Sequence, residues 1–302
     1  MTRATEVRRY EVVHRTTYRY DEPVEVGHTV ARLRPRPLPL QDVEDAVVEV
    51  EPEPTFTREE VDAFGNLVDY VAIERPHDHL VVTGSSHVAV SHPEPPAGAW
   101  AGLWEDAVRL TDGDRSDDGL LARQCRLDSP RVSRHPDLAA FGTGAFRPGR
   151  PLGEAAAELT ATIQETFEFV PGTTDVTTPV LEVLATRRGV CQDFAHLLVG
   201  ALRSLGLGAR YVSGYLETEP PPGQPHFVGA DASHAWVGVY VPGAGWVDLD
   251  PTNGLVQPDR HITVAWGRDY TDVVPVRGVL YGPPADQALT ISVDVVPVAA
   301  TT

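Results

Sequence analysis

The chain has 302 residues, with 25 basic and 43 acidic side chains and a formal net charge of −18. A surface this acidic argues against a nucleic-acid or anionic-membrane partner, because both of those partners attract basic proteins. All the basic residues are arginine, so catalysis through a Schiff base on a lysine of the enzyme is excluded as well.

The compartment can be inferred from the N-terminus and from cysteine usage. The opening "MTRATEVRRYEVVHRTTYRY" lacks the apolar segment and the small-residue cleavage site of a signal peptide, and no run of eighteen apolar residues occurs. The two cysteines, Cys125 and Cys191, cannot make a disulfide framework, and their spacing matches no zinc pattern. We therefore expect a cytoplasmic protein without a metal or another cofactor, and the oligomeric state is left open.

Residues 8–92 are predicted to form β-strands. Val, Tyr and Thr recur there, often in alternation, between Pro, Gly and Asn turns such as "DAFGNLV". We expect a β-sandwich whose scattered histidines are structural. The stretch "SHPEPPAGAW" then marks a boundary, so the predicted domains are 1–95 and 96–302.

Residues 100–205 are predicted to be mainly helical, with helices in "PLGEAAAELTATIQETFEF" and "TTPVLEVLATRRG". The pattern then returns to strands in "ARYVSGYL", "SHAWVGVYV" and "GWVDLD", and one more strand is expected in "ALTISVDVVPV". The Pro- and Gly-rich stretch "ETEPPPGQPHFVGADA" is expected to be a loop that flanks a site. The fold class that follows is α+β.

Cys191 lies just ahead of an amphipathic helix. The apolar positions of that helix follow the spacing i, i+3, i+4, i+7, i+8, i+11, and they are Phe194, Leu197, Leu198, Ala201, Leu202 and Leu205. At a helix N-terminus, the free N–H groups and the helix dipole favour a thiolate and can stabilise an oxyanion. Gly189 would let the backbone turn sharply and approach a substrate. Cys191 is therefore a candidate nucleophile.

A nucleophilic cysteine needs a base and a group that orients the base. His234 opens one predicted strand, Asp250 closes the next, and "VPGAG" joins them. A three-residue loop that pairs Val241 with Gly245 would put both side chains on one face, diagonally about 7–8 Å apart. Asp248 shares the strand and the face of Asp250, so the spacing alone leaves both acids open.

Other candidates for the site are weaker. His196 follows Cys191 by five residues and points away from the thiol on a helix. Asp193 lies in the first turn, where a carboxylate is favoured by the helix dipole alone. Cys125 has no comparable surroundings and is expected to be inert.

These motifs resemble the transglutaminase-like superfamily, and especially its bacterial members with a β-rich N-terminal domain. The matching stretches are "GVCQDFAHL", "LRSLGLGARYVSGYL", "ASHAWVGVYVPGAGW", "DPTN", "HITVAWGRDYTDVVPVRGVLYG", "HRTTYRYDEPV" and "DAFGN". The resemblance implies a papain-like core, helices packed on an antiparallel sheet, after the N-terminal sandwich. It makes Cys191 the nucleophile, His234 the base and Asp250, which begins "DPTN", the orienting acid. No stretch resembles the calcium loops of animal transglutaminases, so calcium dependence is not implied.

The expected activity is thiol-dependent acyl transfer from an amide bond of a peptide or protein. The thioester intermediate could pass to water, as in an amidase or peptidase, or to an amine, as in a transglutaminase. We lean toward hydrolysis, because water is always present. A non-catalytic binding module on the same fold is the main alternative, and a zinc site made by Cys191, His234 and Asp250 is a further one.

Overall fold

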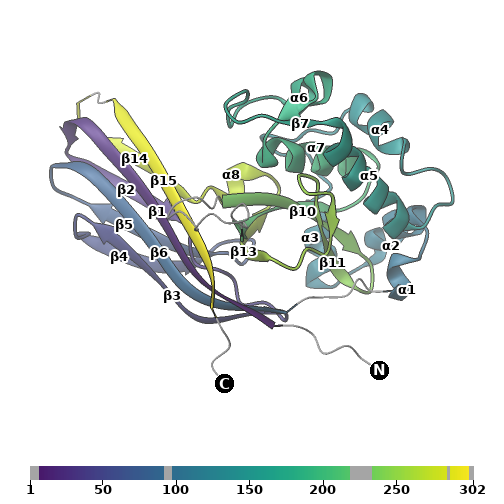
Figure 1. Ribbon diagram of the computed structural model, residues 1–302, viewed down its shortest axis with the longest axis horizontal. Coiled ribbons are helices and arrows are strands. Elements are labelled where there is room, and N and C mark those ends of the chain that lie inside the picture. Colours follow the sequence, from purple (N-terminus) through teal and green to yellow (C-terminus); the bar gives the residue numbers. More distant parts are fainter. Residues whose placement is uncertain (1–6, 92–96, 218–232, 284–285, 299–302) are drawn as a thin grey trace, which may run out of the picture.

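A computed structural model of the chain describes residues 7–91, 97–217, 233–283 and 286–298. In those ranges, the chain forms a sandwich of two sheets beside a mixed core of helices and one central sheet (Figure 1). The expected α+β class, with an N-terminal β-sandwich ahead of helices packed on an antiparallel sheet, is confirmed. No helix in the described ranges is both long enough and apolar enough to cross a membrane.

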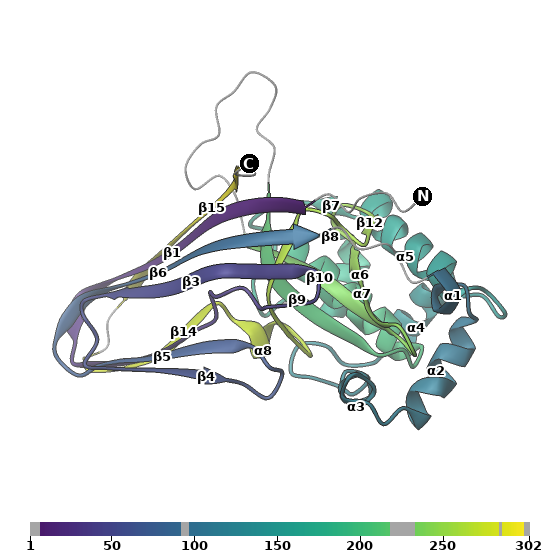
Figure 2. The same ribbon diagram turned by 90° about the horizontal axis from the view of Figure 1, so that it is seen from below.

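The sandwich consists of two antiparallel four-stranded sheets, which Figure 2 shows as two layers. The first has the order β15-β1-β6-β3, with β1 (Val7–Val24), β3 (Gln41–Glu51), β6 (His77–Ser91) and β15 (Gln287–Val298). The second has the order β14-β2-β5-β4, with β2 (Val26–Ala31), β4 (Phe56–Val61), β5 (Leu67–Ile73) and β14 (Val276–Tyr281). Each sheet therefore takes one edge strand from the end of the chain. Strands β14 and β15, which lie beyond residue 95, complete the two sheets of the sandwich. The predicted boundary between domains at residue 95 stays a prediction.

The central sheet is antiparallel, with the order β12-β11-β10-β9-β13. Its strands are β9 (Ala209–Leu216), β10 (Ser233–Val241), β11 (Gly245–Asp250), β12 (Leu255–Val256) and β13 (His261–Gly267). A short parallel pair is formed by β7 (Glu168–Phe169) and β8 (Arg188–Gly189). The strands expected at 209–250 are all present. Most of "ETEPPPGQPHFVGADA" lies outside the described residues, so its expected loop stays a prediction.

The helices of the core lie between the sandwich strands β6 and β14 in the sequence. They are α1 (Ala97–Trp100), α2 (Trp104–Gly113), α3 (Asp117–Gln124), α4 (Pro136–Thr143), α5 (Leu152–Thr166), α6 (Val180–Thr186), α7 (Cys191–Ser204) and α8 (Tyr270–Val273). Helix α7 is the most deeply placed, and its side chains Leu197, Leu198 and Leu202 are fully buried. Because each such side chain contributes about 1.5–3 kcal/mol by leaving water, the position of the α7 N-terminus is firmly set.

One hydrophobic core runs through both halves of the molecule, since it includes Tyr10 and Val12 of β1 as well as the buried face of α7. Polar contacts also join the halves: Gln41 Nε2 donates to the Thr263 carbonyl (2.7 Å), and Asn66 Nδ2 donates to the Trp266 carbonyl (2.9 Å). Asn66 belongs to the tight turn predicted at "DAFGN", where Gly65 has a φ of +76°. These polar contacts hold the sandwich against β13, the edge strand of the central sheet.

Candidate active site

Cys191 is the first residue of helix α7 and is half-buried. The start of this helix is capped by Asp193, whose Oδ2 accepts hydrogen bonds from the Val190 N–H (2.8 Å) and the Thr174 hydroxyl (2.6 Å). The carboxylate expected in the first turn therefore has a definite structural task. It fixes the backbone from which the Cys191 side chain projects.

Gly189 also has a structural reason to be glycine. A Cβ on this residue would lie 2.8 Å from the Asp193 Oδ2, so the missing side chain makes room for the capping carboxylate, and the approach to a substrate stays a prediction. Gly189 pairs with Phe169 in the short β7–β8 ladder. Gly189 thus stabilises the N-terminus of α7 through the β7–β8 pair and through the space that it leaves for the Asp193 side chain.

The hairpin between β10 and β11 has the predicted register. Val241 pairs with Gly245, so the loop contains three residues, and Gly243 and Gly245 have φ values of +81° and +88°. This register places the side chains of His234 and Asp250 on the same face of the sheet. The His234 Nε2–H donates to Asp250 Oδ2 at 2.9 Å.

Asp250 is completely buried and accepts five hydrogen bonds. Its Oδ1 accepts from the backbone N–H groups of Thr252 (2.9 Å) and Asn253 (3.1 Å). Its Oδ2 accepts from His234, from Asn253 Nδ2 (2.7 Å) and from His261 Nε2 (2.8 Å). The "DPTN" turn therefore wraps around the carboxylate and holds its negative charge in the interior.

The sequence analysis missed His261. This histidine opens β13, at the far edge of the central sheet from β12, and is 5% exposed. It donates to the same oxygen of Asp250 as His234 does, and the two imidazole rings are 5.3 Å apart, edge to face. The stretch "DRHITV" carries no local signal for this contact. The contact between His261 and Asp250 depends on the order of the strands in the central sheet.

The pKa values of this cluster follow from its burial and its hydrogen bonds. Burial lowers the pKa of His234, but the hydrogen bonds with Asp250 and Cys191 outweigh burial and raise that pKa from 6.5 to about 10. Burial raises the pKa of Asp250, yet its bonds to the two histidines hold that pKa well below its usual range. At neutral pH, His234 is therefore an imidazolium between an ionised Asp250 and the Cys191 side chain.

The alternative candidates lie in other surroundings. The Asp248 Oδ2 accepts from Trp236 Nε1 (3.1 Å), and His196 Nε2 accepts from the Tyr270 N–H (3.1 Å). Burial lowers the pKa of His196 to about 4 and raises the pKa of Cys125 to about 11. His196 is thus neutral and engaged with the backbone, and Cys125 is a buried thiol without nucleophilic character.

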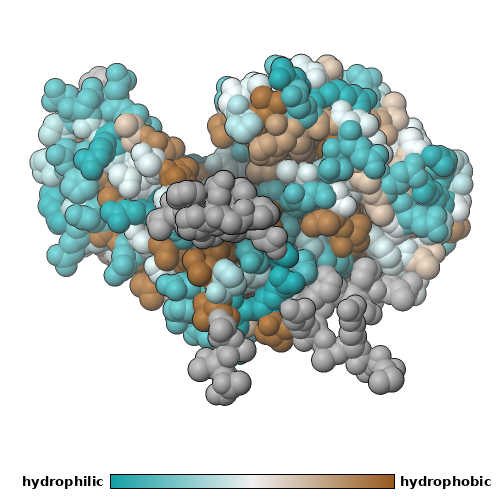
Figure 3. Space-filling model, in the orientation of Figure 1, coloured by the Kyte–Doolittle hydropathy of each residue, from teal (hydrophilic) through white to brown (hydrophobic). Residues whose placement is uncertain are grey.

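A pocket of about 250 Å³ opens beside Cys191 and His234. The sandwich supplies one of its walls, through residues of β1 and β15. His14 of β1 lines the pocket, with Nδ1 3.1 Å from the Tyr215 hydroxyl and Nε2 3.2 Å from the Thr16 hydroxyl. Figure 3 shows the surface hollowed between the sandwich and the helical core.

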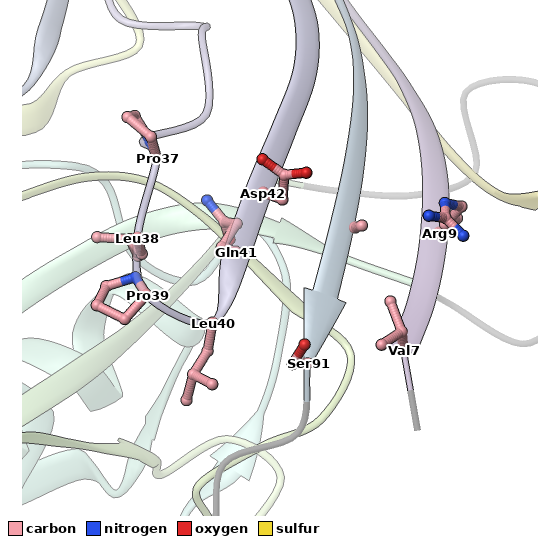
Figure 4. Close-up of a pocket in the computed structure, with 10 residues that line it drawn as sticks. Val7, Arg9, Pro37, Leu38, Pro39, Leu40, Gln41, Asp42 and Ser91 are labelled. Carbon is pink, nitrogen blue, oxygen red and sulfur yellow. The ribbon is translucent and has the colours of Figure 1, made fainter. Parts of the chain in front are cut away.

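A larger hollow, of about 550 Å³, lies at the ends of β1 and β6 near the turn before β3 (Figure 4). Val7, Arg9, Leu40 and Asp42 are among its lining residues, and Arg9 forms an ion pair with Glu44 at 3.0 Å. None of the candidate catalytic side chains lines it. The smaller pocket is therefore the better candidate for substrate binding.

The site has some of the donors that a metal would need. One donor atom from each of His234, Asp250 and His261 lies within 4.8 Å of the others, whereas the predicted zinc set had Cys191 in place of His261. The two imidazoles already donate to Asp250 Oδ2 at 2.9 and 2.8 Å. Hydrogen bonding therefore accounts for the cluster as it stands.

Comparison with known proteins decides the family. Residues 10–89 match the bacterial transglutaminase-like N-terminal region, and residues 142–251 match the transglutaminase-like superfamily. An uncharacterized protein of Mycobacterium tuberculosis is 38% identical over 297 residues, which cover 96% of this chain and 93% of that protein. The chain belongs to the transglutaminase-like superfamily. The resemblance drawn from the motifs is confirmed.

Two further proteins are similar to the chain, one in its fold and one over part of its sequence. The crystal structure of a candidate cysteine protease from Cytophaga hutchinsonii has a TM-score of 0.76 at 17% identity and covers 99% of this chain and 93% of its own. A protein-glutamine gamma-glutamyltransferase from Pseudomonas aeruginosa is 40% identical over 76 residues, which are 25% of this chain and 11% of that protein. The first comparison shows that the fold is shared along the whole chain.

Proposed function

We propose that the protein is a thiol-dependent acyl-transfer enzyme that acts on an amide bond of a peptide or protein. Cys191 is the nucleophile, His234 the general base and acid, and Asp250 the group that orients His234. The observation that carries the proposal is the position of His234. Its pKa is raised to about 10 by hydrogen bonds to Asp250 on one side and Cys191 on the other, against the opposing effect of burial.

The first half of the reaction breaks the amide bond. His234 holds the proton of the Cys191 thiol while the sulfur attacks the carbonyl carbon, and the oxygen gains negative charge beside the N–H groups at the start of α7. When the C–N bond breaks, His234 delivers its proton to the departing nitrogen, and a thioester on Cys191 remains. Asp250 keeps the imidazole oriented and stabilises its positive charge throughout, which is the task of the acid in serine triads.

The second half passes the acyl group from the thioester to an acceptor. With water as the acceptor, the enzyme is an amidase or peptidase, and this is the outcome we favour because water needs no binding site of its own. With a primary amine as the acceptor, it is a transglutaminase. The partial similarity to a protein-glutamine gamma-glutamyltransferase supports keeping amine transfer as the second candidate.

A mass-spectrometric assay separates these reactions. Glutamine-containing peptides are incubated with the protein, with and without a small primary amine. Cleavage or deamidation that is unaffected by the amine indicates a hydrolase, and gain of the amine mass indicates a transglutaminase. Cys191→Ala should abolish either product, and Cys125→Ser is the matched control that should leave it unchanged. Full activity in Cys191→Ala contradicts the proposal.

The alternative is a catalytically silent binding module on the same fold. It predicts that Cys191 is an ordinary thiol, despite its contact with His234. Iodoacetamide near neutral pH distinguishes the two. In the proposed enzyme, iodoacetamide alkylates Cys191 much faster than the buried Cys125. In a binding module, it reacts slowly with both cysteines.

We also propose that the protein works in a reducing, cytoplasmic setting. Both cysteines are free thiols in the structure, and the proposed nucleophile acts only in its reduced form. Loss of activity without a reductant, restored by adding one, is the expected behaviour.

A further inference from the structure

The pocket beside Cys191 has an apolar wall that comes from the sandwich. Strand β15 supplies Leu289 and Ile291, and strand β1 supplies Thr16 and Tyr18. Leu289 lies directly opposite Tyr18, and Ile291 lies opposite Thr16, in the antiparallel β1–β15 pair. Residues directly opposite each other project from the same face of a sheet, so these four side chains form one continuous surface toward the pocket.

The burial of β15 changes at the edge of this pocket. Leu289, Ile291, Val293 and Val295 alternate along the strand and share one face. Val293 and Val295 are 1% and 0% exposed within the main core, whereas Leu289 and Ile291 are 52% and 53% exposed. The apolar face that packs against the core thus continues into the candidate active site as a half-exposed surface. Figure 3 shows hydrophobic surface on the flank of the sandwich that faces the core.

The described lining of the pocket carries no fixed charge apart from the candidate catalytic group. Among the described residues that line it, none is Asp, Glu or Arg, in a chain that carries 68 such side chains and no lysine. His14 is neutral at physiological pH, because burial lowers its pKa to about 4. A carboxylate placed against Leu289 and Ile291 would lose part of its hydration without gaining a counter-charge from these side chains.

We propose that Leu289 and Ile291 form a subsite that takes a leucine-sized, uncharged aliphatic side chain of the substrate, next to the residue whose carbonyl Cys191 attacks. The inference rests on the proposed function, since it assigns the substrate class of the same site. It gives the sandwich a task in catalysis, which is to select the acyl donor. The occupant covers the apolar surface that the fold leaves open beside the nucleophile.

Two covalent probes test the subsite without a known substrate. Acetyl-Leu-Gly chloromethyl ketone and acetyl-Glu-Gly chloromethyl ketone each react with Cys191 as the thiolate displaces chloride, so that a C–S bond forms and the C–Cl bond breaks. Intact-protein mass spectrometry gives the rate, and each rate is divided by that of iodoacetamide for the same protein. We expect the Leu probe to react at least about tenfold faster than the Glu probe, which corresponds to about 1.4 kcal/mol.

Variants on the two faces of β15 provide the comparison. In the double variant Leu289→Ser, Ile291→Ser, the ratio of the normalised Leu-probe rate to the normalised Glu-probe rate should fall toward one. The matched control is Val296→Ser, Val298→Ser, at positions 43% and 42% exposed on the opposite face of the same strand, which should keep the wild-type preference. Leu289→Arg should raise the rate at which the Glu probe reacts, because the guanidinium would pair with the probe's carboxylate. This variant tests the subsite by a gain of reactivity.

The outcomes separate this inference from the proposed function. If iodoacetamide reacts rapidly at Cys191 but the Leu and Glu probes do not differ, the subsite is wrong and the nucleophile stands. If the double variant keeps the full preference, the assignment to Leu289 and Ile291 is wrong. If iodoacetamide reacts at Cys191 as slowly as at Cys125, the proposed nucleophile fails, and the subsite falls with it.

Discussion

Replacing Asp250 by Asn tests the central electrostatic claim with little change of shape. The substitution removes the negative charge that accepts the His234 Nε2–H at 2.9 Å. A hydrogen bond to a charged group is worth about 1.5–3 kcal/mol, and one pKa unit corresponds to about 1.4 kcal/mol. The pKa of His234, raised to about 10 in the wild type, should therefore fall by about one to two units in Asp250→Asn.

Histidine-ring NMR across a pH series measures this directly. The His234 signal is assigned as the one missing from His234→Gln, and its midpoint is compared between wild type and Asp250→Asn. Asp248→Asn is the matched control, because that carboxylate accepts from Trp236 and not from His234. A wild-type midpoint near 6.5, or a midpoint that Asp250→Asn leaves in place, would refute the reasoning.

The same pair of proteins should differ in how stability depends on pH. A pKa that folding raises from 6.5 to about 10 contributes stability that is fully present below pH 6.5 and lost as the pH rises through 10. That contribution is about 5 kcal/mol in the wild type. Asp250 stays ionised across this window, because its folded pKa lies far below it. The free energy of unfolding in urea should therefore fall between pH 6.5 and 10, and this fall should be smaller by about 1.5–3 kcal/mol in Asp250→Asn than in the wild type.

Two further substitutions test the supports of the site. His261→Phe removes the donor 2.8 Å from Asp250 Oδ2 and should lower the free energy of unfolding by about 1.5–3 kcal/mol in urea at pH 7; an unchanged value would mean that this bond adds nothing. Gly189→Ala places a Cβ 2.8 Å from the Asp193 carboxylate. It should therefore lower the free energy of unfolding by about 0.5–2 kcal/mol and slow the alkylation of Cys191. Gly113→Ala has no neighbour within 4 Å and should change neither quantity.

Local periodicity was enough to predict the parts of the site that lie close together in the chain. The 3.6-residue repeat after Cys191 predicts a helix that begins at or just after that residue, and α7 begins at Cys191. The number of residues between two alternating strands determines whether His234 and Asp250 share a face, and the predicted three-residue loop is the one observed. Both arguments need only the geometry of one helix and one hairpin. Asp250 was separated from Asp248 only by the family resemblance, since both share a strand and a face.

The tertiary structure decided which distant strands became neighbours, and with them the rest of the site. His261 reaches Asp250 because the chain crosses the central sheet after β12 and places β13 beside β9. Leu289 lines the same pocket as Cys191 because β15, near the end of the chain, pairs with β1. A strand's own sequence specifies the two faces that it presents, but its neighbours are chosen by the burial of apolar surface over the whole fold. The sequence by itself therefore determined the nucleophile's helix and the hairpin opposite it, whereas long-range packing decided the second histidine and the apolar wall.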